Sequence, residues 1–437
     1  MILTGQLLQC LGLLLFAAHA WRCGSPGLAA ACLGLIVVVF SRHKATPYLL
    51  GPALLGMALV FAATARDMLL FRLTAGLPFG RLAVILSAVV AVCLAGGLFA
   101  LSRRFIAHGR HGGDSPVAQA TAFWLTAGLL ALARSKAPVT LLLADRFFPG
   151  WGTFEILLLA LYAAWLVGKL VAAPRTGPIR LRYWSLFSLV FFSQLLLGLV
   201  GISACLMTGA LHLPVPALIV AGPVYRGGGL FMPILYLATL FLVGPGWCSH
   251  LCYIGAVDAV CACGGRATPT RLPSRLTSWR VVSLTLVIGA AIGLRGLGVA
   301  TGTAVWLAAG FGLAGVGLMV TLSRKTGVMI HCTMFCPIGL VSSLLGRVLS
   351  FWRLRIGPGC DGCSRCARVC RYLALSPADL ARGRPGHSCT LCGDCVGVCP
   401  GGRIGYRFPG LSAHAARTAY LTLLVSLHAV FLGVARI

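Results

Sequence analysis

The sequence has few charged residues and very few acidic ones. Charged side chains make up 10% of its 437 residues, and Asp and Glu together number only 8, whereas an average soluble domain is about 25% charged. This scarcity excludes an ordinary soluble protein. The 36 Lys and Arg residues give a net charge of +28, but no basic helix or aromatic–basic platform for nucleic acid accompanies them. We therefore interpret the positive charge as loops held against anionic lipid headgroups.

Apolar runs of membrane length recur along the chain and predict a mainly α-helical, polytopic membrane protein with roughly eleven spans. The second run is shorter than the others. The runs lie near residues 2–21, 26–40, 47–65, 82–101, 117–133, 151–172, 183–208, 229–245, 280–296, 303–322 and 415–434. Arg and Lys collect in the stretch 323–412, with Arg324 and Lys325 directly behind the tenth run. This bias predicts an N-in, C-out orientation with that stretch in the cytoplasm.

Composition divides the chain into four parts. Residues 1–175 are an N-terminal transmembrane helical region with few polar side chains. Residues 176–352 are a second transmembrane unit that contains two cysteine pairs. Residues 353–410 are rich in Arg, Gly and Cys and predict a small α+β domain, and residues 411–437 return to the membrane as one more helix.

The 19 cysteines are unevenly spaced. Five are scattered through apolar runs, where free cysteine behaves as a small hydrophobe. The other fourteen all follow residue 247. In a reducing compartment, short-spaced groups of this kind indicate metal binding rather than disulfides. The scattered five are Cys10, Cys23, Cys32, Cys93 and Cys205.

Two cysteine runs carry the strongest signal: CDGCSRCARVC at 360–370 and CTLCGDCVGVCP at 389–400. Both have the spacing C-x2-C-x2-C-x3-C, in which three cysteines of one run bind a 4Fe–4S cluster and the fourth binds the other cluster. Zinc is the alternative, but zinc uses two cysteines per knuckle and gains nothing from the third and fourth. We therefore predict two 4Fe–4S clusters. The first cysteine set is Cys360, Cys363, Cys366 and Cys399, and the second cysteine set is Cys389, Cys392, Cys395 and Cys370.

This segment resembles bacterial two-cluster ferredoxins. It departs from them in having Arg371, not proline, after Cys370, and in the 18 residues between the runs. Neither departure removes a ligand. Positive charge near a cluster raises its reduction potential and attracts acidic partners, but a solvated, lipid-facing surface is an equal explanation of the arginines. They are Arg365, Arg368, Arg371, Arg382, Arg384, Arg403 and Arg407.

Two further motifs, GPGWCSHLCYIGAVD at 244–258 and HCTMFCPIGL at 331–340, each contain C-x3-C followed by a hydrophobic residue and glycine. Positions i and i+4 share one helix face, so each pair can present two thiols together, and two such pairs make a possible four-thiolate metal or iron–sulfur site. The alternative is two unconnected helix ends with buried cysteines. Cys261 and Cys263 are spare ligands or loop cysteines. The candidate ligands are Cys248, Cys252, Cys332 and Cys336.

Histidines raise the question of a haem or quinone site. A facing pair among His19, His212 and His428 would suit a b-type haem, because polar residues in lipid are costly and often functional. An interfacial histidine that only hydrogen-bonds is commoner, so the sequence does not favour haem. His250 and His331 flank the C-x3-C pairs, where a hydrogen-bonding role is the expectation. The loop HLPVPALIVAGPVYRGGG, with His212, Tyr225 and Arg226, fits either a quinone pocket or a Pro- and Gly-rich linker.

Over about residues 180–410, the order of helices, C-x3-C, helices, C-x3-C-P and paired cysteine runs resembles the membrane-bound ferredoxin-type iron–sulfur proteins of the NapH/NosR group, from periplasmic nitrate and nitrous oxide respiration. The resemblance implies a multi-pass protein of the bacterial cytoplasmic (inner) membrane that passes electrons between quinol, cytoplasmic clusters and redox partners. The four C-x3-C cysteines and the eight cluster cysteines match the family's motifs. Tyr253 replaces the proline expected after Cys252, the flavin-binding domain is absent and residues 1–175 are extra, which puts a denitrification role in doubt.

The predicted function is therefore membrane electron transfer between the quinone pool and the two clusters, as a possible quinol dehydrogenase component. One alternative is a copper-type metal reductase or assembly factor for a respiratory oxidase, in which the C-x3-C pairs handle a metal ion. Another is a non-catalytic wiring subunit of a larger redox complex. Loss of metal reduction on substituting Cys332 or Cys336 would favour the first alternative, and purification with stoichiometric partners the second.

Overall fold

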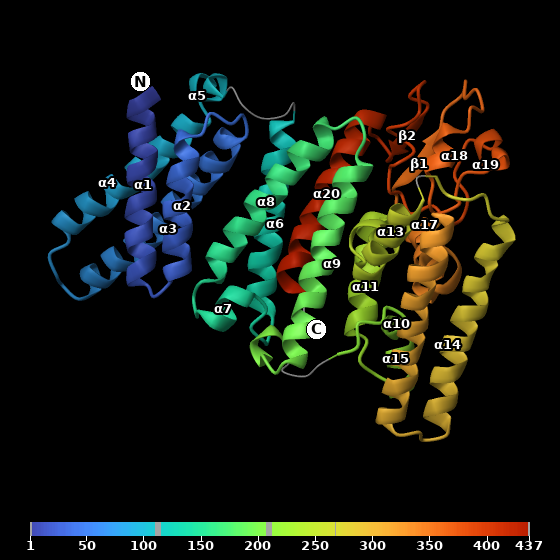
Figure 1. Cartoon of the computed structure of the whole chain (residues 1–437). Coiled ribbons are helices and arrows are strands. Elements are labelled where there is room, and N and C mark those ends of the chain that lie inside the picture. The colour runs from blue at the N-terminus through green and yellow to red at the C-terminus, as the bar shows by residue number, and fades with distance from the viewer. Residues whose placement is uncertain (1, 110–114, 207–211, 267, 436–437) are drawn as a thin grey trace. The chain divides into compact units, whose positions relative to one another are not determined.

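The computed structural model describes residues 2–109, 115–206, 212–266 and 268–435. It separates into two compact units, Met1–Ala172 and Ala173–Ile437 (Figure 1). Within the described residues, ten helices are long and apolar enough to cross a membrane, judged by length and composition. They account for all of the predicted runs except 26–40. That run forms α2 (Pro26–Phe40), whose 15 residues fall short of the roughly 20 that a membrane span needs.

The first unit is a helical bundle. Its apolar, alanine- and leucine-rich stretches favour helix, and proline occupies the first turn of α2, α3 and α6, where its missing N–H costs no hydrogen bond. Cys32 and Cys93 are buried in its hydrophobic core, as packing residues rather than ligands. The helices are α1 (Ile2–Arg22), α2, α3 (Thr46–Thr74), α4 (Gly80–Ala100), α5 (Arg103–His108), α6 (Pro116–Lys136), α7 (Leu143–Phe147) and α8 (Gly152–Ala172).

The second unit combines helices with the cysteine-rich segment (residues 353–410). Two π-helical turns, Met319–Ser323 and His331–Phe335, interrupt its second half. The predicted run 183–208 forms a helix that begins earlier and ends at Leu199. The helices are α9 (Gly177–Leu199), α10 (Leu218–Arg226), α11 (Phe231–Val243), α12 (Trp247–His250), α13 (Tyr253–Gly265), α14 (Trp279–Gly296), α15 (Thr301–Leu318), α16 (Arg324–Thr326), α17 (Pro337–Leu349) and α20 (Ala413–Val434).

The membrane part of this unit is an internal repeat. Helices α9, α11 and α13 form one triplet, and α14, α15 and α17 form another in the same order (Figure 1). In each triplet the second helix leads to a C-x3-C pair and the third begins directly after it. The third helix packs on the first of its own triplet, and the two triplets interlock, because α11 contacts α17 and the π turn after α15 contacts α13. The sequence shows only the twin motifs; the repeat of helices becomes visible in the fold.

The cysteine-rich segment has a two-stranded antiparallel sheet, β1 (Arg353–Ile356) with β2 (Ile404–Arg407). Alternate residues of both strands are buried, which is the period-2 pattern of a sheet with one covered face. Two short helices, α18 (Arg365–Val369) and α19 (Pro377–Ala381), lie between the strands in sequence. The strands therefore join the two ends of the segment, and both cysteine runs lie between them, the first run partly in α18.

Candidate functional site

The first cysteine set surrounds a cavity of about 120 Å³, which Asp361 and Arg403 also line. Cys360 and Cys363 are exposed, Cys399 is half-buried and Cys366 is buried. Cys366 interacts electrostatically with Cys360 and Cys399, and burial raises its pKa. The backbone N–H of Arg403 donates to Cys399 Sγ at 3.3 Å. The structure therefore places Cys399, from the second run, beside the first run.

The second cysteine set lies deeper. Cys395 is buried and Cys370, Cys389 and Cys392 are half-buried. Cys395 interacts electrostatically with the other three, so Cys370, from the first run, lies with the second run. Burial raises the pKa of Cys370 to about 12, and the backbone N–H of Ala374 donates to its sulfur at 3.3 Å. Each run thus gives its fourth cysteine to the other.

Both runs turn in the same way around their second cysteine. In the first run the flanking residues Gly362 and Ser364 have positive φ angles (67° and 56°), and in the second run Leu391 and Gly393 do (55° and 81°). A left-handed backbone costs a non-glycine residue roughly 1–2 kcal/mol. Such strain is typical of functional sites, and here it falls on Ser364 and Leu391, each beside the second cysteine of its run.

Within the described ranges, no three His, Cys, Asp or Glu side chains are placed to hold one metal ion. Four thiolates around one zinc ion would lie within about 4 Å of one another, since a Zn–S bond is about 2.3 Å. A four-iron cluster is also held by four thiolates, so the ligand type by itself suits either group.

The second set is anchored to the membrane helices. Arg180, near the start of α9, forms an ion pair with Asp394 at 2.6 Å and donates to the carbonyl of Ser249 at 3.1 Å. Ser249 in turn donates its hydroxyl to the carbonyl of Thr390 at 2.9 Å. Thr390 and Asp394 belong to the second cysteine run, and Ser249 lies between the cysteines of the first C-x3-C pair. These bonds hold the two cysteine motifs directly against each other.

Arg371, the departure from the ferredoxin pattern, has a structural role. Its guanidinium donates to the carbonyls of Gly327 at 2.7 Å, Ala262 at 2.9 Å and Arg266 at 3.1 Å. Its own carbonyl accepts from the N–H of Met329 at 3.1 Å. A proline has no side-chain donors and could not make these bonds. Arginine at this position therefore gives up the stiffness of a proline turn and hydrogen-bonds the cysteine-rich segment to the membrane part.

The two C-x3-C pairs come together, but neither lies on one continuous helix as the spacing predicts. Cys248 is in α12 and Cys332 in a π turn, whereas Cys252 and Cys336 have extended backbones immediately before α13 and α17. Extended geometry suits the residue before a proline, and Trp184 fixes the other break by donating to the carbonyl of Cys252 at 2.8 Å. Electrostatic interactions link all four thiols.

Glycines allow each pair to fold tightly. A Cβ on Gly255 would lie 2.7 Å from the carbonyl oxygen of Cys248, and a Cβ on Gly339 would lie 2.7 Å from that of Cys332. Both obstacles are backbone atoms, which cannot rotate away as a side chain does.

We expect Gly255→Ala and Gly339→Ala each to lower the free energy of unfolding by about 1–3 kcal/mol through overpacking. Gly289→Ala in α14 is the control, because a Cβ there meets nothing within 4 Å and alanine favours helix. Thermal unfolding in detergent measures all three. Equal melting temperatures for all three variants would contradict the tight packing.

The histidines considered as haem ligands lie in different surroundings. His428 packs on Tyr183 and Phe187, with ring centroids 4.7 and 5.8 Å apart, and Tyr183 hydrogen-bonds His250. His212 is exposed, and His19 lies in the first unit. His428 therefore belongs with the first C-x3-C pair rather than with another span histidine.

The loop that fits either a quinone pocket or a Pro- and Gly-rich linker is partly helical. Tyr225 donates to the carbonyl of Val299 at 2.7 Å, and residues 218–226 form α10. Residues 214–217 line a cavity of about 20 Å³ together with His331 and Cys336. This volume is below the range of about 300–1,000 Å³ that is typical of ligand pockets. The loop therefore packs against the second C-x3-C pair without forming a quinone pocket there.

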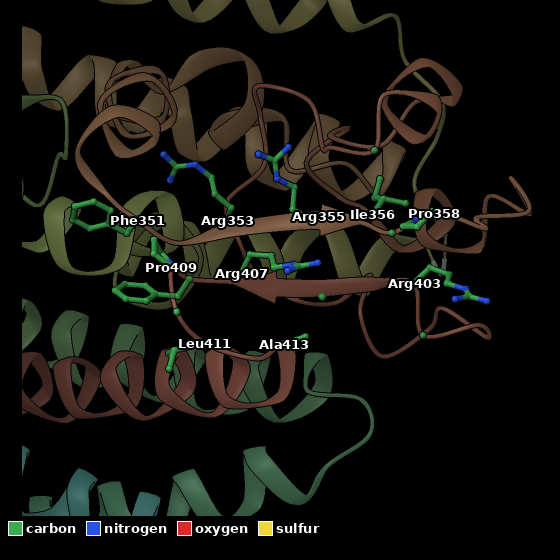
Figure 2. Close-up of a pocket in the computed structure, with 16 residues that line it drawn as sticks. Phe351, Arg353, Arg355, Ile356, Pro358, Arg403, Arg407, Pro409, Leu411 and Ala413 are labelled. Carbon is green, nitrogen blue, oxygen red and sulfur yellow. The ribbon is translucent and has the colours of Figure 1, made fainter.

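A basic groove of about 930 Å³ lies along the two strands. Figure 2 shows Arg353, Arg355 and Arg407 on the strands and Arg403 at one end, with Leu411 near the start of α20. Arg403 also lines the cavity of the first cysteine set. Between residues 353 and 410 the sequence has nine arginines but only three acidic residues, all Asp. The groove is therefore suited to an anionic partner beside the first set.

Sequence reasoning missed four polar residues around the cysteines: Arg180, Asp258, Arg280 and Ser342. All four are buried. A signal was present for three of them, because ionisable residues inside or at the ends of membrane spans are rare and usually functional. Asp258 is one of only 8 acidic residues and lies within the apolar stretch Phe231–Gly265.

Comparison of the chain with protein-family models, curated proteins and solved structures finds no match in any of the three.

Proposed function

We propose that this membrane protein transfers electrons between the quinone pool and a redox partner through two 4Fe–4S clusters held by its two cysteine sets. One observation carries the proposal: the second set is fastened to the membrane helices through Arg180 and Ser249, whereas the first set opens to solvent beside a basic groove. One set thus faces the membrane and the other faces a partner. The fold of the cysteine-rich segment would then be that of a two-cluster ferredoxin.

The residues fit this cofactor. Each set offers four thiols, the ligands that 4Fe–4S clusters take, and each run bends around its second cysteine through left-handed residues. When bound, the clusters would supply one-electron transfer. The N–H groups of Ala374 and Arg403 donate to ligand sulfurs, and such bonds help to set cluster potentials.

We place the cysteine-rich segment in the cytoplasm. Thiols stay reduced there, and the arginines and lysines of stretch 323–412 favour the same side. The N-terminus is then also cytoplasmic if α2 crosses the membrane despite its 15 residues. The membrane is the bacterial inner membrane in this proposal, as the family resemblance implies.

The partner in this proposal is an acidic redox protein that docks in the basic groove. We expect Arg355→Glu/Arg407→Glu to slow electron transfer to an acidic flavodoxin, used as the probe, and to flatten the decrease of that rate with rising salt. Arg103→Glu/Arg275→Glu, outside the groove, is the charge-matched control. Stopped-flow absorbance measures both rates, and equal salt dependence in the two variants would contradict docking in the groove.

Anaerobic purification tests the proposal as a whole. We expect at least about eight irons and eight sulfides per chain, two four-iron clusters, and electron paramagnetic resonance signals that a quinol analogue elicits. Zinc in place of iron would refute the clusters. Clusters that dithionite reduces but no quinol reduces, and that never reduce a quinone, would refute the link to the quinone pool and favour a metal reductase.

A further inference from the structure

We propose that Cys248, Cys252, Cys332 and Cys336 bind a third iron–sulfur cluster, at the interface between the two helical triplets. Its use as a one-electron relay to the second cysteine set rests on the proposed function, whereas the site itself rests on the geometry of the two C-x3-C pairs. No bond is made or broken in that relay: each electron that enters the site leaves toward the second set.

The first argument is that the backbone builds the same ligand loop twice. The N–H of Cys252 donates to the carbonyl of Trp247 at 3.0 Å, and the N–H of Cys336 donates to that of His331 at 2.7 Å. The φ and ψ angles are −80° and 116° at Cys252 and −70° and 118° at Cys336. Two unrelated helix ends would not share the break, the hydrogen bond and the close glycine contact.

The second argument is that each half of the site supports the other. The carboxylate of Asp258, six residues after Cys252, accepts the N–H of Cys332 at 3.0 Å. At the equivalent position of the second motif, six residues after Cys336, Ser342 lies beside the thiol of Cys248. These crosswise contacts hold the two pairs in register.

The third argument is electrostatic. Arg280 is buried, donates to the carbonyl of Gly339 at 3.1 Å and interacts with Cys248, Cys332 and Cys336. Cys252 and Cys336 also lie at the N-termini of α13 and α17, 13 residues each, where the helix dipole stabilises a thiolate. Neutral packing cysteines would not need a buried guanidinium, since isolated buried charge is costly.

Buried polar atoms around the pairs point to a bound group. Among the described residues, Asp258 Oδ1, His250 Nε2 and both ring nitrogens of His331 are buried without a hydrogen-bond partner. Buried polar groups are nearly always paired, so unpartnered atoms beside both C-x3-C pairs call for an explanation such as a bound ion or cofactor.

The chemistry of the donor set selects the class of group. Four thiols suit zinc or an iron–sulfur cluster, but the proposed one-electron relay needs a redox-active group, and zinc has no redox chemistry. A cluster with four cysteine ligands spans a larger ring and exists in two-iron and four-iron forms. Its position also suits a relay, because Ser249, between Cys248 and Cys252, bonds to Thr390 of the second cysteine run.

The test compares iron, sulfide and Mössbauer spectra of ⁵⁷Fe-labelled full-length proteins purified anaerobically. We expect the wild type to hold about two or four irons per chain beyond the eight of the two cysteine sets. Cys252→Ser/Cys336→Ser should lose that excess and its spectral component. The matched control is Cys261→Ser/Cys263→Ser, farther along α13, which should lose neither.

A second variant separates this inference from the proposed function. Cys363→Ser/Cys392→Ser removes one ligand from each cysteine set and should lose only their iron. If that variant loses iron while Cys252→Ser/Cys336→Ser keeps all of it, the third cluster is refuted and the proposed function stands. If wild-type protein holds only about eight irons, or zinc at the C-x3-C pairs, the inference is refuted without any variant, so misfolding of a variant cannot rescue it.

Discussion

Replacing Arg180 with methionine is expected to lower the free energy of unfolding by about 3–5 kcal/mol and to detach the second cysteine run from the membrane helices. Arg180 and Asp394 pair at 2.6 Å with side chains only 7% and 21% exposed. Removing one partner leaves the Asp394 carboxylate largely buried without its countercharge, which costs far more than an exposed pair gains. The carbonyl of Ser249 loses a donor as well.

Arg182→Met is the matched control, because Arg182 is exposed two residues along the same helix. Unfolding by detergent titration, followed by circular dichroism, measures both variants. A double-mutant cycle with Asp394→Asn then isolates the coupling between the two side chains. If Arg180→Met and Arg182→Met were equally stable, the pair would not hold the segment to the membrane part.

Replacing Cys392 with serine is expected to abolish reduction of the first cysteine set's cluster by a quinol analogue, while dithionite still reduces it. Serine offers a hard oxygen ligand in place of a soft thiolate, so the second set should lose or alter its cluster. The second set is bonded to the membrane part through Thr390 and Asp394. Under the proposed function, electrons from quinol must then pass through the second set before they reach the first set, to which Cys360 belongs.

Cys363→Ser gives the reverse result under the same proposal. It changes the first set, which opens to solvent, and should leave quinol reduction of the second set unaffected. Electron paramagnetic resonance of both variants, recorded after quinol and after dithionite, measures the order in which the two clusters receive electrons. Full quinol reduction of the first set in Cys392→Ser would mean that electrons enter by another route.

Much of the site follows from local sequence. The two C-x2-C-x2-C-x3-C runs group eight cysteines crosswise by spacing alone, because a loop of that length cannot return its fourth cysteine to the same cluster. The structure places Cys370 and Cys399 in the same crosswise groups. Membrane helices are also a local property, since length and apolar composition define them. The ten long helices therefore lie where ten of the eleven apolar runs predict them. The remaining run forms the short α2.

Helix breaks and long-range pairs are not local properties. C-x3-C predicts two thiols on one helix face, but Cys252 and Cys336 lie at breaks that depend on Trp184 and on the helix that follows. Arg180 and Asp394 are 214 residues apart, and no periodicity connects them.

The sequence by itself determined how the eight cysteines of the two runs group and which stretches suit the membrane, because spacing and hydropathy act within a few turns of chain. The tertiary structure alone decided which cysteine set faces the membrane part and that two helical triplets interlock around four thiols. Those outcomes depend on the burial of single polar residues, such as Asp258 and Arg280. The free-energy cost of burying them is set by partners that are distant in sequence and come close only in the folded protein.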